Sequence, residues 1–279
     1  MILVTGATGA IGSLLVQQLI QAGMPVRVFT RNPEKAAKFG SAVEVFVGNL
    51  DDENSLVHAM QGVERFFLIT SSTQQDKNAL EAAKQTGASH VVKISTQEAG
   101  WTPVEGHGHW HKEREDLIRA SGIASTILRP TMYMNFALSW ISSIRAENTI
   151  YVAGGNGKLA PIDPWDVASV AKAALTEDGY KNLAYELTGP ELLTFGDMAE
   201  VISKTTGQTV RRVEISESKQ GEIFAKMGLP KHTVDGLVET FRLIQRGRFS
   251  YTTKDVEIST GSKPHTFKMW MQEHLKAFQ

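Results

Sequence analysis

The chain opens with Met1-Ile-Leu-Val-Thr-Gly6-Ala-Thr-Gly9-Ala-Ile-Gly12, which predicts a β-strand, a glycine-rich turn and the start of a helix. Three glycines stand three residues apart, directly after an apolar run and directly before the amphipathic segment Ser13–Ala22. Glycines in such a turn let backbone N–H groups approach a pyrophosphate, whose negative charge the helix N-terminus attracts. The stretch therefore predicts a dinucleotide site, the alternative being a structural turn without a ligand. The predicted contacts are Gly6, Thr8, Gly9, Ala10, Ile11 and Gly12.

The end of the second predicted strand indicates which dinucleotide is bound. An NAD-binding domain would place an aspartate or glutamate there for the ribose 2′-hydroxyl, whereas this chain has Thr30-Arg31-Asn32. Arg31 offers a planar set of donors that matches phosphate oxygens, and Lys35 and Lys38 follow closely. This pattern favours NADP(H). The alternative is that Arg31 is only a solvated loop residue.

Composition limits the remaining classes of function. The length of 279 residues suits one large or two unequal domains. The net charge of −1 provides no basic footprint, so overall charge does not suggest nucleic acid as a partner. The chain has no cysteine, which excludes disulfides, thiolate metal sites and a cysteine nucleophile. It leads directly into a strand and has no apolar run of membrane-spanning length, so we expect a cytoplasmic protein with no membrane partner.

Residues 1–130 alternate short apolar segments with helical ones. The predicted strands are Ile2–Thr5, Val26–Thr30, Val43–Val47, Arg65–Ile69, Val91–Ser95 and Ser125–Leu128. Short apolar strands separated by helices indicate an α/β fold with a doubly wound parallel sheet of the Rossmann type. Because ligands of such sheets bind beyond the carboxyl ends of the strands, further cofactor contacts are expected there. They are Asn49, Leu50, Thr70, Ser71, Ser72 and Ser95.

The alternation of strands and helices becomes less regular near residue 150. We expect an NADP(H)-binding Rossmann domain over residues 1–150 and a smaller C-terminal α/β portion over residues 151–279 that covers the nucleotide cleft. Asp163-Pro164-Trp165-Asp166 predicts the start of a helix over residues 167–176, which we expect to pack back on the Rossmann sheet. The C-terminal portion mixes shorter strands, such as Ala184–Leu187, with helices, such as Phe267–Ala277.

Several motifs together carry a resemblance to a known family. They are Thr5-Gly-Ala-Thr-Gly-Ala-Ile-Gly12, Arg31, Gly48-Asn49, Ser121-Gly-Ile-Ala-Ser-Thr-Ile-Leu-Arg-Pro130 and Thr194-Phe195…Ala199. With them the chain resembles the NmrA-like members of the atypical short-chain dehydrogenase/reductase superfamily over nearly its whole length. It is most similar to the bacterial branch of NADPH-dependent quinone oxidoreductases and triphenylmethane dye reductases. The block His111…Glu115…Ser121-Gly122 and Tyr133 are more particular to that branch.

The chain lacks the Tyr-x-x-x-Lys pair with which a standard short-chain dehydrogenase passes a proton to or from its substrate. The residues four beyond its tyrosines are Ala137, Gly155, Ala184, Gly189 and Asp255. This absence weighs against an ordinary ketone reductase or a sugar epimerase. A quinone that accepts hydride becomes a weakly basic hydroquinone anion, and a cationic dye becomes neutral, so orientation over the nicotinamide suffices. The expected substrate is an electron-poor, planar acceptor.

His111 is the candidate catalytic residue within the block Glu105–Lys112. The resemblance implies that it faces the nicotinamide, where a histidine could donate a hydrogen bond or a proton near neutral pH. The alternative is that His111 caps the helix that follows. A metal site made of His107, His109 and His111 is not expected, because their alternating spacing converges only on a strand and this segment is predicted to be a glycine-broken loop entering a helix.

The resemblance also implies a substrate pocket after Arg129-Pro130. Tyr133 is the preferred polar and catalytic contact, and Asn135 is expected to bind substrate beside it. Met132 and Phe136 are expected to form an apolar wall, together with Met134 and Trp140. Ordinary core packing is the alternative for Met134 and Trp140.

Three classes of function follow. The first is an NADPH-dependent reductase that transfers hydride directly to a quinone or similar aromatic small molecule, without flavin or metal. The second is an NADP(H)-binding redox sensor or transcriptional regulator of the NmrA type, which contacts a protein partner without turnover. The third is a sugar epimerase or dehydratase, which the missing Tyr-x-x-x-Lys pair disfavours most. The oligomeric state does not follow from the sequence.

Overall fold

The structure is a computed structural model that describes all residues from Met1 to Gln279 and divides into two compact units. Unit 1 comprises Met1–Ser95, Trp110–Arg129 and Pro164–Tyr185. Unit 2 comprises Thr96–His109, Pro130–Asp163 and Glu186–Gln279. This division differs from a single boundary after residue 150, because the chain passes between the units several times.

Unit 1 is built on a seven-stranded sheet with the strand order β3-β2-β1-β4-β5-β6-β8. In chain order the strands are β1 (Ile2–Thr5), β2 (Val26–Thr30), β3 (Glu44–Val47), β4 (Arg65–Leu68), β5 (His90–Ile94), β6 (Ala124–Pro130) and β8 (Leu183–Leu187). Neighbouring strands from β3 through β6 are parallel. The predicted doubly wound parallel sheet is confirmed. The late segment expected as a strand of the C-terminal portion is instead β8, at the edge of this sheet.

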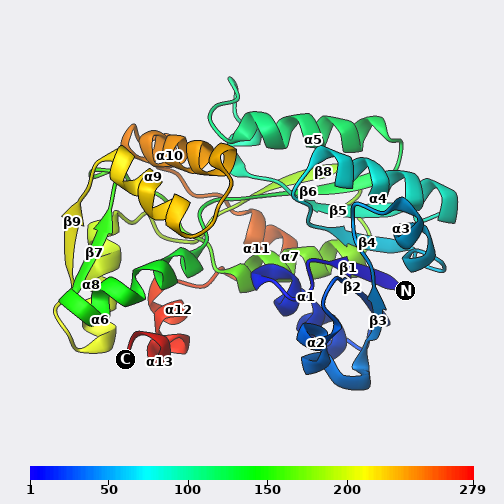
Figure 1. Cartoon of the computed structure of the whole chain (residues 1–279), viewed down its shortest axis with the longest axis horizontal. Coiled ribbons are helices and arrows are strands. Elements are labelled where there is room, and N and C mark those ends of the chain that lie inside the picture. Colours follow the sequence, from blue (N-terminus) through cyan, green and yellow to red (C-terminus); the bar gives the residue numbers. More distant parts are fainter. The chain divides into compact units, whose positions relative to one another are not determined.

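Helices cover both faces of the sheet (Figure 1). One face packs against α3 (Glu53–Ala59), α4 (Thr73–Thr86) and α5 (Gly108–Ala120), and the other against α1 (Ala10–Gln21) and α7 (Pro164–Thr176). A short helix, α2 (Pro33–Ala36), and a 3-10 turn, η1 (Ala37–Ala42), lead from β2 to β3. All four residues of β1 are buried, as expected for a central strand covered on both faces.

The N-terminal residues of α4 and α7 explain where these helices begin, and α7 begins three residues before the predicted range 167–176. Helix α4 begins at Thr73 because the Ser72 hydroxyl accepts a hydrogen bond from the Gln75 N–H. Helix α7 begins at Pro164, since the fixed φ of proline suits the first helical position. Only glycine fits at Gly108, the first residue of α5, because a Cβ there would lie 2.5 Å from the Glu98 carbonyl carbon.

Unit 2 contains a parallel pair of strands, β7 (Thr149–Val152) and β9 (Arg211–Glu214), and helices around an aromatic core. These elements are η2 (Gln97–Gly100), η3 (Met134–Trp140), α6 (Ile141–Glu147), α8 (Phe195–Thr206), α9 (Glu217–Lys226), α10 (Lys231–Gln245), α11 (Asp255–Thr260), α12 (Phe267–Glu273) and α13 (Leu275–Phe278). The predicted helix Phe267–Ala277 is thus two short helices, which meet at His274. None of the helices of the chain has the length and apolar character needed to cross a membrane.

Candidate functional site

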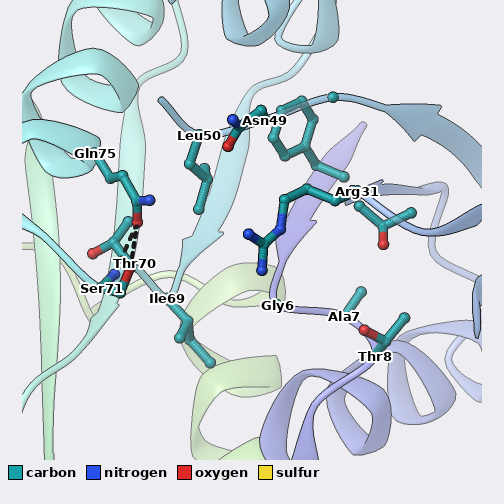
Figure 2. A pocket seen from close by; sticks show the side chains of 13 residues that line it. Gly6, Ala7, Thr8, Arg31, Asn49, Leu50, Ile69, Thr70, Ser71 and Gln75 are labelled. Carbon is teal, nitrogen blue, oxygen red and sulfur yellow. Dashed lines mark hydrogen bonds between the residues drawn. The ribbon is translucent and has the colours of Figure 1, made fainter. Parts of the chain in front are cut away.

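A cavity of about 280 Å³ lies in unit 1 at the carboxyl ends of β1, β2, β3 and β4 (Figure 2). Its lining consists of Gly6, Ala7, Thr8, Phe29, Thr30, Arg31, Gly48, Asn49, Leu50, Ile69, Thr70, Ser71 and Gln75. This edge of a parallel sheet is where α/β proteins bind their ligands. The lining residues come from four loops, and the first and last of them, Gly6 and Gln75, lie far apart in the chain.

The glycine turn forms one side of this cavity. Gly6 has a left-handed backbone conformation with φ +61°, which favours glycine. A Cβ on Gly12 would lie only 2.3 Å from the Gly6 carbonyl oxygen, so the helix can approach the turn this closely only with glycine there. Gly9 is the residue before α1 and offers no side chain to cap the helix, and the first turn of α1 carries no acidic residue. The backbone N–H groups at the start of α1 therefore suit an anion such as a pyrophosphate.

The predicted turn residues occupy two kinds of position. Gly6 and Thr8 line the cavity, whereas Gly9, Ala10, Ile11 and Gly12 do not. Gly9 and Ala10 are exposed at the start of α1, and Ile11 and Gly12 are buried within unit 1. Of the six predicted contacts, Gly6 and Thr8 are thus at the cavity surface. The other four belong to the turn and to the start of α1.

Arg31 directly follows β2, and its exposed side chain extends into the cavity (Figure 2). Its guanidinium forms neither a hydrogen bond nor an ion pair with another residue of the chain. Lys35 and Lys38 are exposed just beyond it, although the Lys38 Nζ lies 5.1 Å from the centre of the Phe39 ring. The free guanidinium of Arg31 gives this end of the cavity the chemistry of a phosphate site.

The loops after β3 and β4 form the opposite side of the cavity. Asn49, Leu50, Thr70 and Ser71 line it as predicted, but Ser72 and Ser95 do not. The Ser72 hydroxyl caps α4. Ser95 is 4% exposed, and its hydroxyl donates a 2.5 Å hydrogen bond to Glu115 Oε1. Both hydroxyls therefore serve the packing of unit 1, and the structure does not bring them to the cavity.

Three lining residues had no sequence motif to mark them: Phe29, Ile69 and Gln75. Gln75 Oε1 accepts a 2.9 Å hydrogen bond from the Ser71 N–H, while its Nε2 donates a 3.0 Å bond to Asp51 Oδ1. This side chain ties the loop after β4 to the loop after β3. The available signal for Phe29 and Ile69 was their position at strand ends, where an apolar residue also suits the core.

His111 is the fourth residue of α5 and lies in unit 1. Because the helix begins at Gly108, His111 does not cap it, and the capping alternative is wrong. The ring is partly buried and packs edge-on against Trp110, with 4.7 Å between the ring centres. The preceding part of the block Glu105–Lys112, up to His109, belongs to unit 2.

The other predicted substrate contacts lie in unit 2 around the start of η3. Tyr133 is partly buried, and burial raises the pKa of its hydroxyl, which keeps the group protonated as a hydrogen-bond donor. Asn135 and Met132 are also partly buried. With His111 in unit 1 and Tyr133 in unit 2, their joint contribution to one substrate site stays a prediction.

Phe136, predicted to form part of an apolar pocket wall, is partly buried and packs against the core of unit 2. Its ring centre lies 5.4 Å from that of Trp140 and 5.7 Å from that of Phe241, within the aromatic core of unit 2. Met134 and Trp140 are 1% and 3% exposed, as the core-packing alternative predicts. Phe136 therefore packs against one ring of its own segment and against Phe241 of α10, and its place in a substrate-pocket wall stays a prediction.

Known proteins resemble the chain over its whole length. Residues 1–275 match the NmrA-like family. The (4-alkanoyl-5-oxo-2,5-dihydrofuran-3-yl)methyl phosphate reductase of Streptomyces griseus is 33% identical over 100% of this chain and 99% of that protein. The NAD(P)H azoreductase of Xenophilus azovorans is 32% identical with the same coverage.

A solved structure is also similar to the chain over nearly its whole length. The NADPH-dependent quinone oxidoreductase of Escherichia coli, complexed with NADPH, has a TM-score of 0.87 and 28% identity, covering 99% of this chain and 100% of that chain. The matched part of this chain includes the glycine turn, Arg31 and the aromatic core in each of these comparisons. The chain belongs to the NmrA-like family.

Proposed function

We propose that this chain is an NADPH-dependent oxidoreductase that transfers hydride directly to a quinone or a similar electron-poor aromatic acceptor. The observation that carries the proposal is the free Arg31 guanidinium in a cavity that also contains the glycine turn at the start of α1. The similar proteins support the reductase class, since they are named as reductases of a furanone phosphate, an azo compound and a quinone.

The residues of the cavity fit the phosphate groups of NADPH. The backbone N–H groups in the first turn of α1 would hold the pyrophosphate, because no side-chain cap competes for them. The Gly9 N–H instead donates a 2.9 Å hydrogen bond to the Gly6 carbonyl oxygen and so closes the turn. Arg31 would hold the 2′-phosphate through paired, charge-assisted hydrogen bonds. A carboxylate at position 31 would repel that phosphate, so this residue determines the preference for NADPH over NADH.

The reaction needs little proton transfer from the protein. When bound, the reduced nicotinamide supplies the hydride, and the acceptor becomes a hydroquinone anion that takes up one proton. Tyr133 would donate a hydrogen bond to an acceptor oxygen, since burial keeps its hydroxyl protonated. His111 would donate a hydrogen bond or a proton, as histidine does near neutral pH.

The deciding experiment measures NADPH oxidation by the purified chain with a panel of quinones, azo dyes, cationic dyes and enones. We expect turnover with acceptors of at least one of these classes, and a lower KM for NADPH than for NADH. NADPH that binds tightly but is oxidised no faster than in buffer across the whole panel would contradict the proposal and favour the sensor function.

A further inference from the structure

Three charged side chains meet in the interior of unit 1, behind the wall of the cavity. Asp76 comes from α4, Lys93 from β5 and Arg114 from α5, and their exposed fractions are 0%, 2% and 1%. Lys93 Nζ lies 3.1 Å from Asp76 Oδ1, and Arg114 Nε pairs with Asp76 Oδ2. Burying charges is costly unless they are paired, so this cluster of two cations and one anion calls for an explanation.

The three side chains converge on the hydroxyl of Thr70. Lys93 Nζ donates a 2.7 Å hydrogen bond to Thr70 Oγ1, and Arg114 Nη2 donates a second one. The Thr70 hydroxyl in turn donates a 2.6 Å hydrogen bond to Asp76 Oδ1. A hydroxyl accepts two hydrogen bonds and donates one, so every position of this group is filled. The Thr70 hydroxyl therefore has no position left for a cofactor, although Thr70 lines the cavity.

The residue before Thr70 is attached to the glycine turn. The Ile69 N–H donates a 2.8 Å hydrogen bond to Thr5 Oγ1, at the end of β1. The Thr5 hydroxyl donates to the carbonyl oxygen of Phe67 at 3.0 Å. Ile69 Cβ lies 3.3 Å from the point where Gly6 would carry a Cβ. The segment after β4 is thus held by the turn on one side and by the charged cluster on the other.

We infer that Lys93 and Arg114 are positioning residues that, together with Asp76, fix Thr70 and so hold the segment Ile69–Ser71 as the wall of the cofactor cavity. The inference rests on the proposed function, because it takes the cavity to be the NADPH site. Neither cation lines the cavity, so both act through Thr70 rather than by contact with the cofactor.

This arrangement makes cofactor affinity dependent on pH. Burial lowers the pKa of Lys93 to about 8, an effect that Asp76 opposes and Arg114 strengthens. These two are the charged groups that face Lys93, from α4 and α5. Lys93 is therefore charged at pH 7 and loses its proton as the pH rises through about 8. The ion pair with Asp76 is then lost, so Thr70 is held less firmly at high pH.

The test measures the Kd for NADPH by calorimetry between pH 6.5 and 9.5 in four variants. Thr70→Val keeps the shape of the side chain and removes the hydroxyl, and Lys93→Met removes the buried donor. Losing hydrogen bonds to charged groups should raise the Kd by about tenfold in both. Thr70→Ser keeps the hydroxyl and should bind NADPH as tightly as wild-type protein. Lys77→Met changes an exposed residue next to Asp76 and should also leave the Kd unaltered. In wild-type protein the Kd should rise above pH 8, and this rise should be absent in Lys93→Met.

Circular dichroism and thermal unfolding establish that each variant is folded. If Lys93→Met fails to fold, Thr70→Val still decides the question, because it keeps all three charges. A folded Thr70→Val protein that binds NADPH as wild-type protein does, with the same pH dependence, would overturn the inference alone. Wild-type protein that binds no NADPH would overturn the proposed function, and the inference with it.

Discussion

Arg129 binds Glu115 through two parallel hydrogen bonds, from Nε to Oε1 at 2.9 Å and from Nη2 to Oε2 at 2.6 Å. The pair joins α5 to β6, and Glu115 is only 1% exposed. Both residues belong to motifs through which the sequence resembles its family. The two motifs are therefore joined directly in unit 1. Glu115 also accepts a hydrogen bond from the Ser95 hydroxyl, which follows β5.

Glu115→Gln should lower the free energy of unfolding by about 3 kcal/mol, the order of magnitude for breaking a buried ion pair and leaving one charge without its partner. Urea unfolding at pH 7 measures this quantity. Glu113→Gln is the matched control, since Glu113 lies exposed on the same helix. Equal stability of the two variants would show that the pair contributes little.

The carboxylate of Glu115 should also make the free energy of unfolding depend on pH. Burial alone would raise the pKa of Glu115, but the hydrogen bonds from Arg129 and Ser95 outweigh it and lower the pKa. A carboxyl with a lowered pKa in the folded state contributes stability above its unfolded pKa of about 4.3, and this stability is lost as the pH falls through the lower folded value. Thermal unfolding between pH 7 and 3 should therefore show a smaller loss of stability in Glu115→Gln than in wild-type protein. Parallel curves would contradict this.

Arg31→Ala should remove most of the preference for NADPH. One charge-assisted phosphate contact readily accounts for a tenfold difference in affinity, or about 1.4 kcal/mol. The Kd for NADPH should rise by about that factor, while the Kd for NADH, which lacks the 2′-phosphate, serves as the internal control and should stay nearly constant. Wild-type protein that binds both dinucleotides equally would refute the role of Arg31.

Tyr133→Phe and His111→Ala should each reduce quinone-dependent NADPH oxidation by about ten- to a hundredfold, the usual scale for losing a positioned donor. Steady-state rates with saturating NADPH measure the loss, and the Kd for NADPH should change by less than a few-fold, since neither residue lines the cavity. Because burial raises the pKa of Tyr133, ionisation of this hydroxyl should cause no fall in rate below pH 9. Unchanged turnover in both variants would show that neither side chain takes part in the reaction.

The fold and one half of the candidate site follow from contiguous stretches of sequence. β1 and β2 have the predicted bounds, Ile2–Thr5 and Val26–Thr30, because both are rich in β-branched residues and end at turn residues. The glycine turn and Arg31 are positioned by residues within a few places of them in the chain, so spacing alone predicts their location. The missing Tyr-x-x-x-Lys pair is likewise a local property of the sequence.

Only tertiary packing decided how the remaining side chains are used. The Thr70 hydroxyl is occupied by Lys93 and Arg114, which lie 23 and 44 residues further along the chain. The Ser95 hydroxyl is likewise taken by Glu115, 20 residues away. No local pattern encodes these partners, because they meet only when α4 and α5 pack onto the sheet. The sequence by itself determined the cofactor turn, whose chemistry resides in the backbone, and packing determined which side chains remain free to bind.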